Sequence, residues 1–415
     1  MRSPQFPQVK DHRGFSTPSP DSAPSDSLPR LYSRAFFAMA LANFLILSSF
    51  STFFLFPLFI LKHGGNEIDI GVIMGAFTLA SVICRPWISE MIDRIGRKKS
   101  YTIGCLQMSV LPLAYLYFHG EVTDFYLPLL GVRIIHGMGF ALCLTAVFTY
   151  IADLTPEGRL NEGLGIFGVS GLVGTAVGPV IAELVIDRFG FPTLFITAGL
   201  MATLALIIHL PLSETLVRDS SKNKTSFFGV LKIRRIALVA VLAVLFGFGL
   251  AASNGFVAPF ASEQHIPFVS VYYLAYSGSA VLTRVLGGRL ADRINEDRVI
   301  PCAMVLTGLG LASLVFLGSS PMLIVAGLLG GCGHGLLYPS LNVLAIRDMP
   351  AVIRGKITGV FTGSIDAGVF AGSIILGFVG QSAGFRVLFL AAGCALLLAF
   401  VLYRWSRVSR GQIRE

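Results

Sequence analysis

The chain has 415 residues, of which 54% are hydrophobic and 13% are charged, and it contains 45 glycines. Because a soluble domain carries about 25% charged residues, this composition excludes a soluble enzyme, a collagen-like chain and a disordered chain. Twelve membrane-spanning helices of about 20 residues need about 240 residues, and the hydrophobic residues together with glycine supply that number. In such a protein the net charge of +9 is expected to set topology and not to bind nucleic acid.

Apolar segments separated by polar loops fill the chain after residues 1–30, which contain six prolines and are predicted to be a disordered tail. Each of twelve segments is predicted to be a helix that crosses the membrane. They lie at residues 34–61, 69–90, 100–118, 123–150, 161–186, 191–210, 236–260, 270–290, 299–318, 321–346, 356–380 and 385–404. The sequence therefore predicts an all-α integral membrane protein of two six-helix bundles, at 31–210 and 236–405. A polar linker at 211–235 joins them, and a basic tail at 406–415 follows.

The 32 Lys and Arg residues are distributed unequally between the two sides of the membrane. Twenty-six lie in the tails and in the loops on the side of the termini, whereas the opposite side has Lys62, Arg188 and Arg386. Cytosolic loops carry such an excess, so both termini are predicted to be cytosolic and the protein to lie in the cytoplasmic membrane. The remaining three, Arg85, Arg133 and Arg284, stand inside apolar segments.

Several features of the first half recur in the second half at a nearly constant offset. Arg85 and Arg284, 199 residues apart, each precede an Asp-Arg pair by eight residues, and His136-Gly137 recurs 198 residues later as His334-Gly335. At an offset of 194, Gly178, Gly190-Phe191, Phe195 and Ala198-Gly199 recur as Gly372, Gly384-Phe385, Phe389 and Ala392-Gly393. Such a repeat predicts two parallel, pseudo-symmetric halves about an axis along the membrane normal, as in many secondary transporters.

The stretch after the second segment runs S-E-M-I-D-R-I-G-R-K-K at residues 89–99. It resembles the G-x-L-x-D-R-x-G-R-K loop of the major facilitator superfamily, with Ser89 in place of the first glycine. The resemblance implies that Asp93 approaches the N-terminus of helix 11, whose dipole attracts a carboxylate, and latches the cytosolic side in the outward-open state. The implied gate consists of Asp93, Arg94, Gly96, Arg97 and Lys98, with Asp292 and Arg293 from a weaker second copy. The alternative is a basic loop that only sets topology.

The fourth segment contains Arg133, His136, Gly137 and Gly139 in a pattern that is similar to the superfamily's R-x-x-Q-G-x-G-A, with His136 in place of Gln. A charge near the middle of a bilayer costs several kcal/mol or more. Arg133 is therefore expected to face a cavity, water or an acid. His136 is either a cavity residue or a hydrogen-bonded residue of the core.

The fifth segment carries glycines at the spacing G-x8-G-x3-G-P, which resembles the antiporter motif of drug:proton exporters. The matching residues are Gly165, Gly174, Gly178 and Pro179, whereas Ala182 and Glu183 replace the final two glycines of that motif. Glycines spaced by four residues allow helices to approach closely. The alternative interpretation is therefore general packing of small residues.

These motifs make the chain similar, from about residue 34 onwards, to the twelve-helix drug:proton antiporters of the superfamily. The resemblance implies a monomer that exports small, often amphiphilic molecules by alternating access, coupled to inward proton flow. It also implies that helices 1, 4, 7 and 10 line the cavity. Their polar side chains give the candidate cavity residues Asn43, His136, Asn254, His334, Tyr338 and Asn342.

Asp366 is the leading candidate for the proton carrier, and Arg85 is its predicted partner. Both stand about 12–17 Å from the cytosolic end of their helices, and the resemblance places helices 2 and 11 side by side. Opposite charges at one depth should pair, because an unpaired charge there costs several kcal/mol. Arg133 is a further coupling candidate, Glu183 is the rival carrier, and a static bridge is the alternative role of the pair. Arg284 has no acid at the matching positions 170–172.

Two other functions stay open at this point. A proton-coupled importer or facilitator of a sugar or organic acid has the same fold, although residues 211–215 (P-L-S-E-T) differ from the P-E-S-P-R type of sugar porters. A membrane receptor or enzyme is the more remote alternative, since no G-K-[ST] phosphate loop and no nucleophile constellation is present. The six cysteines lie in apolar segments without a metal-binding spacing, so we expect neither a metal site nor a cofactor.

Overall fold

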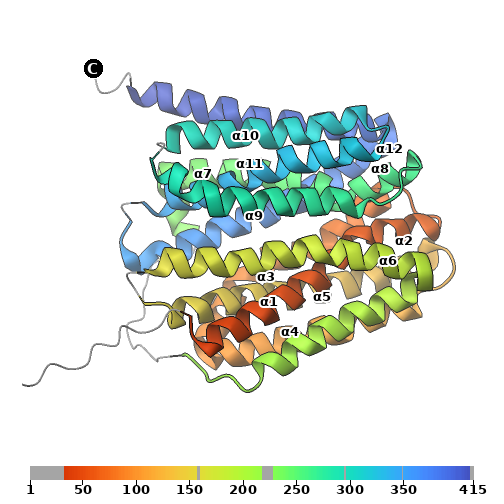
Figure 1. Cartoon of the computed structure of the whole chain (residues 1–415), viewed down its shortest axis with the longest axis horizontal. Helices are drawn as coiled ribbons and strands as arrows, with labels where there is room; N and C mark the ends of the chain where they lie inside the picture. Colours follow the sequence, from red (N-terminus) through yellow and green to blue (C-terminus); the bar gives the residue numbers. More distant parts are fainter. Residues whose placement is uncertain (1–31, 157–158, 217–227, 294–295, 348, 412–415) are drawn as a thin grey trace, which may run out of the picture.

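The computed structural model describes residues 32–156, 159–216, 228–293, 296–347 and 349–411, and these residues form helices joined by short connections (Figure 1). The first half contains α1 (Arg34–Thr52), η1 (Phe53–Leu55), α2 (Phe56–Lys62), α3 (Glu67–Ile95), α4 (Arg97–Ala114), η2 (Tyr115–Tyr117), η3 (Val122–Asp124), α5 (Tyr126–Leu154) and α6 (Leu160–His209). The second half contains η5 (Phe228–Lys232), α7 (Arg234–Gly255), α8 (Val257–Glu263), α9 (Ser270–Arg293), α10 (Glu296–Ser313), η6 (Leu314–Phe316), α11 (Ser320–Ile346) and α12 (Ala351–Gly411).

The two longest helices, α6 and α12, are each a pair of membrane spans. α6 has 50 residues, which corresponds to about 75 Å of helix, more than twice the roughly 30 Å hydrocarbon core of a bilayer. The helical geometry breaks at Gly190 (φ 79°, ψ 179°) and at Gly384 (φ 83°, ψ 166°). These backbone angles are essentially restricted to glycine. The two breaks are 194 residues apart, which is the offset of the sequence repeat.

Twelve spans follow from this division of the described residues. Eight helical stretches are long and apolar enough to cross a membrane, and two of them, α6 and α12, are double. The more polar α4 and α9 complete the set. The predicted all-α, twelve-helix, two-bundle fold is therefore confirmed. The first half fills the lower part of Figure 1 and the second half the upper part.

The predicted loop at 89–99 is instead almost entirely helical. α3 continues to Ile95 and α4 begins at Arg97, so that Gly96 alone separates them. The predicted segment ended at residue 90 because the apolar pattern ends there, whereas α3 continues through the polar residues that follow. Ion pairs one turn apart, Glu90 with Arg94 and Asp93 with Arg97, support this polar last turn.

The halves meet through two helix pairs, α3 with α12 and α6 with α9. The first pair is the neighbourhood of helices 2 and 11 that the resemblance implied. Glycine allows close contact there: a Cβ at Gly71 would lie 2.4 Å from the carbonyl oxygen of Ser373, and a Cβ at Gly377 would lie 2.7 Å from that of Glu67. Within the halves, α1 packs on α6 and α7 packs on α12.

We expect Gly190→Ala to destabilise the protein by about 1–3 kcal/mol, because alanine is strained at this backbone conformation. The cost is conformational and not steric, since the nearest atom to a Cβ at Gly190 is 3.7 Å away. Thermal unfolding of the purified variant measures the effect. Gly278→Ala, at a helical position where a Cβ meets nothing within 4 Å, is the control and should be neutral or stabilising. An unchanged unfolding temperature for Gly190→Ala would contradict the prediction.

Candidate functional site

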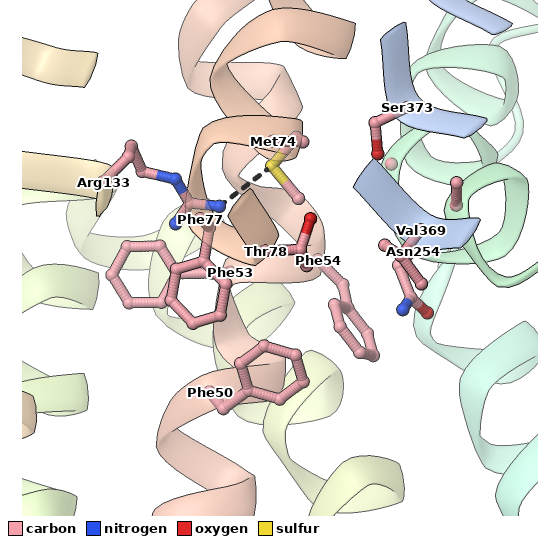
Figure 2. A pocket seen from close by; sticks show the side chains of 12 residues that line it. Phe50, Phe53, Phe54, Met74, Phe77, Thr78, Arg133, Asn254, Val369 and Ser373 are labelled. Carbon is pink, nitrogen blue, oxygen red and sulfur yellow. Dashed lines mark hydrogen bonds between the residues drawn. The ribbon is translucent and has the colours of Figure 1, made fainter. Parts of the chain in front are cut away.

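A cavity of about 30 Å³ lies between the two halves, next to Arg133 (Figure 2). It is lined by aromatic side chains of α1 and η1, by α3 and α5 of the first half, and by α7 and α12 of the second half. Its polar lining consists of Thr78, Arg133, Asn254 and Ser373. A cavity of this size holds water, whereas a drug-sized ligand needs about 300–1,000 Å³. The central site is therefore constricted in this conformation.

Arg133 on α5 is 2% exposed and is held by ring faces. Its guanidinium carbon lies 5.6, 5.2 and 4.7 Å from the ring centres of Phe53, Phe56 and Phe77. Nε donates to the carbonyl oxygen of Ile73 at 3.3 Å, Nη2 contacts the sulfur of Met74 at 3.4 Å, and Nη1 has no partner. Arg133 faces a cavity, as expected. Within the described residues it has no acid partner, and cation–π contacts stabilise its charge instead.

Of the six predicted cavity residues, Asn254 lines the cavity and the other five do not in this conformation. They bond within their own half instead. The pairs are Asn43 with Ser170 (2.9 Å), His136 with Tyr115 (3.2 Å), His334 with Tyr276 (2.8 Å) and Asn342 with Thr358 (3.5 Å), while the ring of Tyr338 packs on Phe361. The contribution of these five residues to a substrate cavity stays a prediction. Polar groups in a membrane interior need partners, and neighbouring helices supply them in part, since Asn43 Oδ1 and His136 Nε2 have no hydrogen-bond partner among the described residues.

The predicted ion pair between Arg85 on α3 and Asp366 on α12 is formed. Arg85 Nη2 donates to Asp366, and Nη1 donates to the hydroxyl of Thr362 at 2.8 Å. The two charged side chains are 16% and 25% exposed. The pair thus joins the two halves in the interior of the α3–α12 interface.

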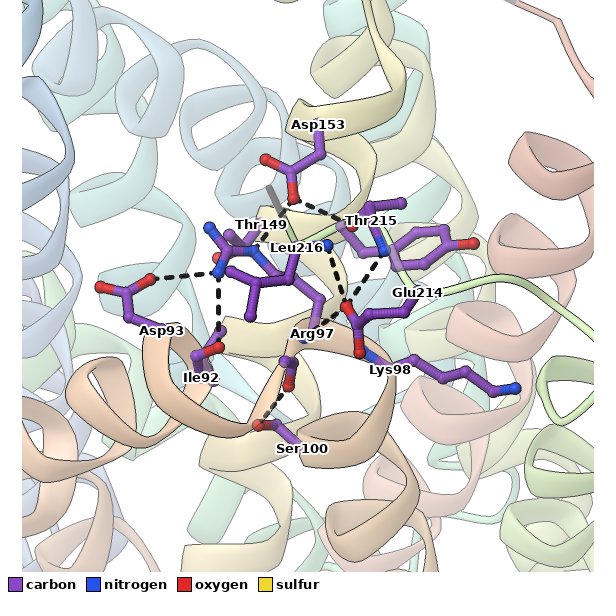
Figure 3. Close-up of polar contacts among 12 residues, drawn as sticks. Ile92, Asp93, Arg97, Lys98, Ser100, Thr149, Asp153, Glu214, Thr215 and Leu216 are labelled. Carbon is purple, nitrogen blue, oxygen red and sulfur yellow. Dashed lines mark hydrogen bonds and ion pairs between the residues drawn. The ribbon is translucent and has the colours of Figure 1, made fainter. Parts of the chain in front are cut away.

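Arg97 is the centre of a polar network at the junction of α3 and α4 (Figure 3). Its Nε donates to Asp153 at 3.0 Å, and its Nη1 lies 3.3 Å from Asp93 and 3.4 Å from the carbonyl oxygen of Ile92. These partners all belong to the first half. Asp93 is 67% exposed, and among the described residues its polar contact is Arg97, so the implied latch to helix 11 is not made in this conformation.

Two other predicted gate residues lie in the second copy of the motif, Asp292 and Arg293, whose side chains are outside the described part of the chain. Arg94 in the first copy is exposed, and its ion pair among the described residues is with Glu90 of its own helix, at 2.6 Å. Gly96 stands at φ +107°, which favours glycine. A Cβ at Gly96 would also lie 2.2 Å from Glu214 Oε2. The glycine is therefore required by backbone conformation and by space.

Glu214, just after α6, caps the start of α4. Its carboxylate accepts from the backbone N–H groups of Arg97 (2.9 Å) and Lys98 (3.1 Å), and from those of Thr215 and Leu216. Partial burial raises the pKa of Glu214, but the four N–H bonds outweigh it and lower that pKa below its ordinary value. The roles of Glu214 and Asp153 were not predicted from the sequence. Each is an acidic residue shortly after an apolar segment, on the side of the membrane whose loops are otherwise basic.

Glu183 on α6 closes the opposite end of the molecule. Its carboxylate accepts from the backbone N–H groups of Val269 (2.7 Å) and Ser270 (3.1 Å), and from the hydroxyl of Ser270. These groups form the N-terminus of α9, where the helix dipole favours a negative charge. Phe54 and Tyr273 also meet across the halves there, with ring centres 5.2 Å apart. The acid that interrupts the glycine motif is thus a helix cap between the halves.

The glycine motif of α6 faces α1. A Cβ at Gly174 would lie 2.5 Å from the carbonyl oxygen of Phe44, and one at Gly178 would lie 2.1 Å from Ser51 Oγ. Gly165 differs, because nothing lies within 4 Å of a Cβ there. Pro179 follows inside the helix and is buried. Close packing of α1 on α6 therefore depends on Gly174 and Gly178.

Comparison with known proteins adds three findings. The chain matches the family described as Major Facilitator Superfamily over residues 36–298 and 268–413. It is 27% identical to the MFS-type transporter MJ1560 of Methanocaldococcus jannaschii over 77% of this chain and 84% of that protein, and 26% identical to the multidrug resistance protein MdtG of Serratia proteamaculans over 90% and 92%. Its fold is similar to that of the nucleoside transporter NupG, with a TM-score of 0.74, 15% identity and coverage of 89% and 99%.

We expect Gly178→Leu to lower the unfolding temperature strongly, because the side chain must separate α1 from α6. Overpacking of this kind costs about 1–3 kcal/mol and occasionally more. Gly165→Leu, in the same motif but facing open space, should be tolerated. Thermal unfolding of both purified variants tests the contrast. Equal unfolding temperatures would show that the motif does not act through helix packing.

We expect the cap at Glu214 to lose its effect in acid. Because the folded state lowers the pKa of this carboxyl, the cap contributes fully above the unfolded value of about 4.3 and is lost as pH falls through the lower folded value. Unfolding temperatures measured from pH 6 to pH 3 should therefore decline less in Glu214→Gln than in the parent protein. Glu263→Gln, at an exposed site, should follow the parent. A parallel decline for Glu214→Gln would count against the cap.

Proposed function

The chain belongs to the Major Facilitator Superfamily, and we propose that it exports small amphiphilic molecules by alternating access, coupled to inward proton flow. It is a multi-pass membrane transporter by family. The proposal of export is supported by relatives named multidrug resistance proteins that align over 90% of the chain. The glycine motif of α6 also resembles that of drug:proton exporters. We place both termini in the cytosol because the basic loops lie on their side.

Alternating access in this proposal is a rocking of the two halves about the α3–α12 and α6–α9 contacts. The present conformation is closed at the end where Glu183 caps α9, whereas Asp93 stays within its own half. In the opposite conformation Glu183 releases α9, and Asp93 moves to the N-terminus of α12. Caps of this kind contribute about 0.5–2 kcal/mol, a size that allows both to be made and broken in a transport cycle.

Proton coupling is assigned to the Arg85–Asp366 pair, the single observation that carries this proposal. The pair is partly buried and joins one half to the other, so a weaker pair allows the halves to separate more easily. Protonation of Asp366 removes the charge that attracts Arg85, which frees α3 from α12. A proton taken up at Asp366 on one side and released on the other thereby drives the conformational cycle.

The aromatic lining supports an amphiphilic cargo. Phe50, Phe53, Phe54 and Phe77 contribute apolar surface to the central cavity, and a few polar groups accompany them. Ligand sites combine such apolar walls with a small number of directing polar groups. A sugar needs a denser set of hydrogen-bonding side chains than this cavity offers.

We expect Asp366→Asn to abolish accumulation that is driven by a pH gradient. One pH unit across the membrane is worth about 1.4 kcal/mol, so one coupled proton permits about tenfold accumulation, and the variant should show none. The measurement is uptake of fluorescent amphiphiles into everted vesicles with and without the gradient. Exchange of cargo at zero gradient should persist, because it needs no net proton transfer.

Glu183→Gln tests the rival carrier in the same assay, and Asp187→Asn, an exposed carboxylate one turn further along α6, is its control. Gradient-driven uptake that survives in Asp366→Asn and disappears in Glu183→Gln would reassign the proton to Glu183. Survival in both variants would leave the Arg85–Asp366 pair as a static bridge and end the coupling proposal.

A further inference from the structure

Arg284 on α9 is the repeat counterpart of Arg85, yet it has no acid partner among the residues that the structure describes. The ring of Tyr338 lies 5.5 Å from its guanidinium carbon, and its Nε has no hydrogen-bond partner. Gly168 on α6 is its neighbour across the halves: a Cβ built there would lie 3.0 Å from Arg284 Nη1. Within the described part of the chain, this guanidinium at the α6–α9 interface therefore makes no hydrogen bond or ion pair to an oxygen.

The repeat shows which groups this second site lacks. Arg85 is held by the hydroxyl of Thr362 and the carboxylate of Asp366, one turn apart on α12. At the offset of 194 that relates α12 to α6, the corresponding residues are Gly168 and Leu172. Arg284 does lie beside Gly168, so the correspondence holds in space. The second copy keeps the arginine and loses both oxygen ligands.

An arginine in a membrane interior is costly unless an anion or a polar group compensates it. Its planar fork matches a carboxylate through two parallel hydrogen bonds, whereas at Arg85 the two nitrogens divide between the carboxylate of Asp366 and the hydroxyl of Thr362. We propose that Arg284 binds the anionic head group of the transported molecule, which takes the place that Asp366 has beside Arg85. The cargo is then an organic anion, such as a carboxylate, with an apolar body. This inference rests on the proposed transport function and names its substrate class.

The surroundings of Arg284 suit such a molecule. Tyr338 offers a ring face beside the guanidinium, and Phe361 packs against that ring with centres 5.3 Å apart, so aromatic surface adjoins the positive charge. The other interior charges also favour an anion. Asp366 neutralises Arg85, whereas Arg133 has ring faces and no acid partner within the described residues. The interior therefore carries excess positive charge, which disfavours cationic cargo.

Binding of three probes to the purified protein in lipid nanodiscs tests the inference. Naphthaleneacetate, naphthaleneacetamide and naphthylmethyl-trimethylammonium share one apolar body and differ in charge. We expect the acetate to bind at least about tenfold more tightly than the other two, as a charge-assisted bidentate contact allows. Arg284→Gln should remove this preference, and Arg284→Lys should keep part of it. Equal affinities for the three probes, undetectable binding of the acetate, or a preference that survives Arg284→Gln would overturn the site.

Leu172→Asp provides a second test that does not remove the arginine. It restores a carboxylate at the position that corresponds to Asp366, so an internal anion should occupy Arg284 and weaken acetate binding at least about tenfold. Leu172→Asn has the same shape without the charge and should bind the acetate as the parent does. If the two variants bind the acetate equally, the carboxylate does not compete for Arg284 and the inference fails. Thermal unfolding of each variant verifies that it is folded.

The two proposals can fail separately. Binding reports neither the direction of transport nor its coupling. Probe discrimination that is retained without gradient-driven uptake would count against proton-coupled export and leave the anion site standing. Gradient-driven uptake that is equal for the three probes would count against the anion site and leave export standing.

Discussion

A charged side chain in the interior of a bilayer costs several kcal/mol unless something compensates it, and three arginines of this chain meet that constraint in three ways. Arg85 has a carboxylate from the other half, Arg133 has three aromatic faces and a backbone carbonyl, and Arg284 has a tyrosine ring and, within the described residues, no acid. In the proposed mechanism each solution serves a different task. The carboxylate of Asp366 exchanges a proton, the aromatic rings hold Arg133 in place, and Arg284 binds the anionic cargo.

Unpaired N–H groups at helix starts are the second recurring element, because they attract carboxylates. Glu214 caps α4 within the first half and joins the end of α6 to the α3–α4 junction. Glu183 caps α9 across the halves, so its bonds break when that end opens in the proposed mechanism. A carboxylate cap therefore stabilises the first half itself at Glu214, and one conformation of the two halves at Glu183. The difference is whether the capped helix belongs to the same half as the carboxylate.

Residue patterns predicted those features that depend on composition and duplication. The twelve spans follow from apolar length and from the repeat. The pairing of Arg85 with Asp366 follows from equal depth in the membrane together with the contact of helices 2 and 11, which the family resemblance implied. The caps made by Glu183 and Glu214 escaped prediction, because a carboxylate alone does not show which helix start lies near it. The hydrogen bonds of Asn43 and His136 to Ser170 and Tyr115 of other helices also escaped prediction, because partners across helices leave no periodic signal in the sequence.

The asymmetry between the two copies offers a physical route for coupling cargo to protons. The copy at α3–α12 has its own acid, and the copy at α6–α9 has none among the described residues, yet both lie where the halves meet. In the proposed mechanism, an anion bound at Arg284 and a proton bound at Asp366 therefore bias the same conformational equilibrium. Neither ligand needs to touch the other, because each shifts the equilibrium by the difference in its affinity for the two conformations. Had both copies kept their acids, protons would act at both interfaces and Arg284 would not be available to the cargo.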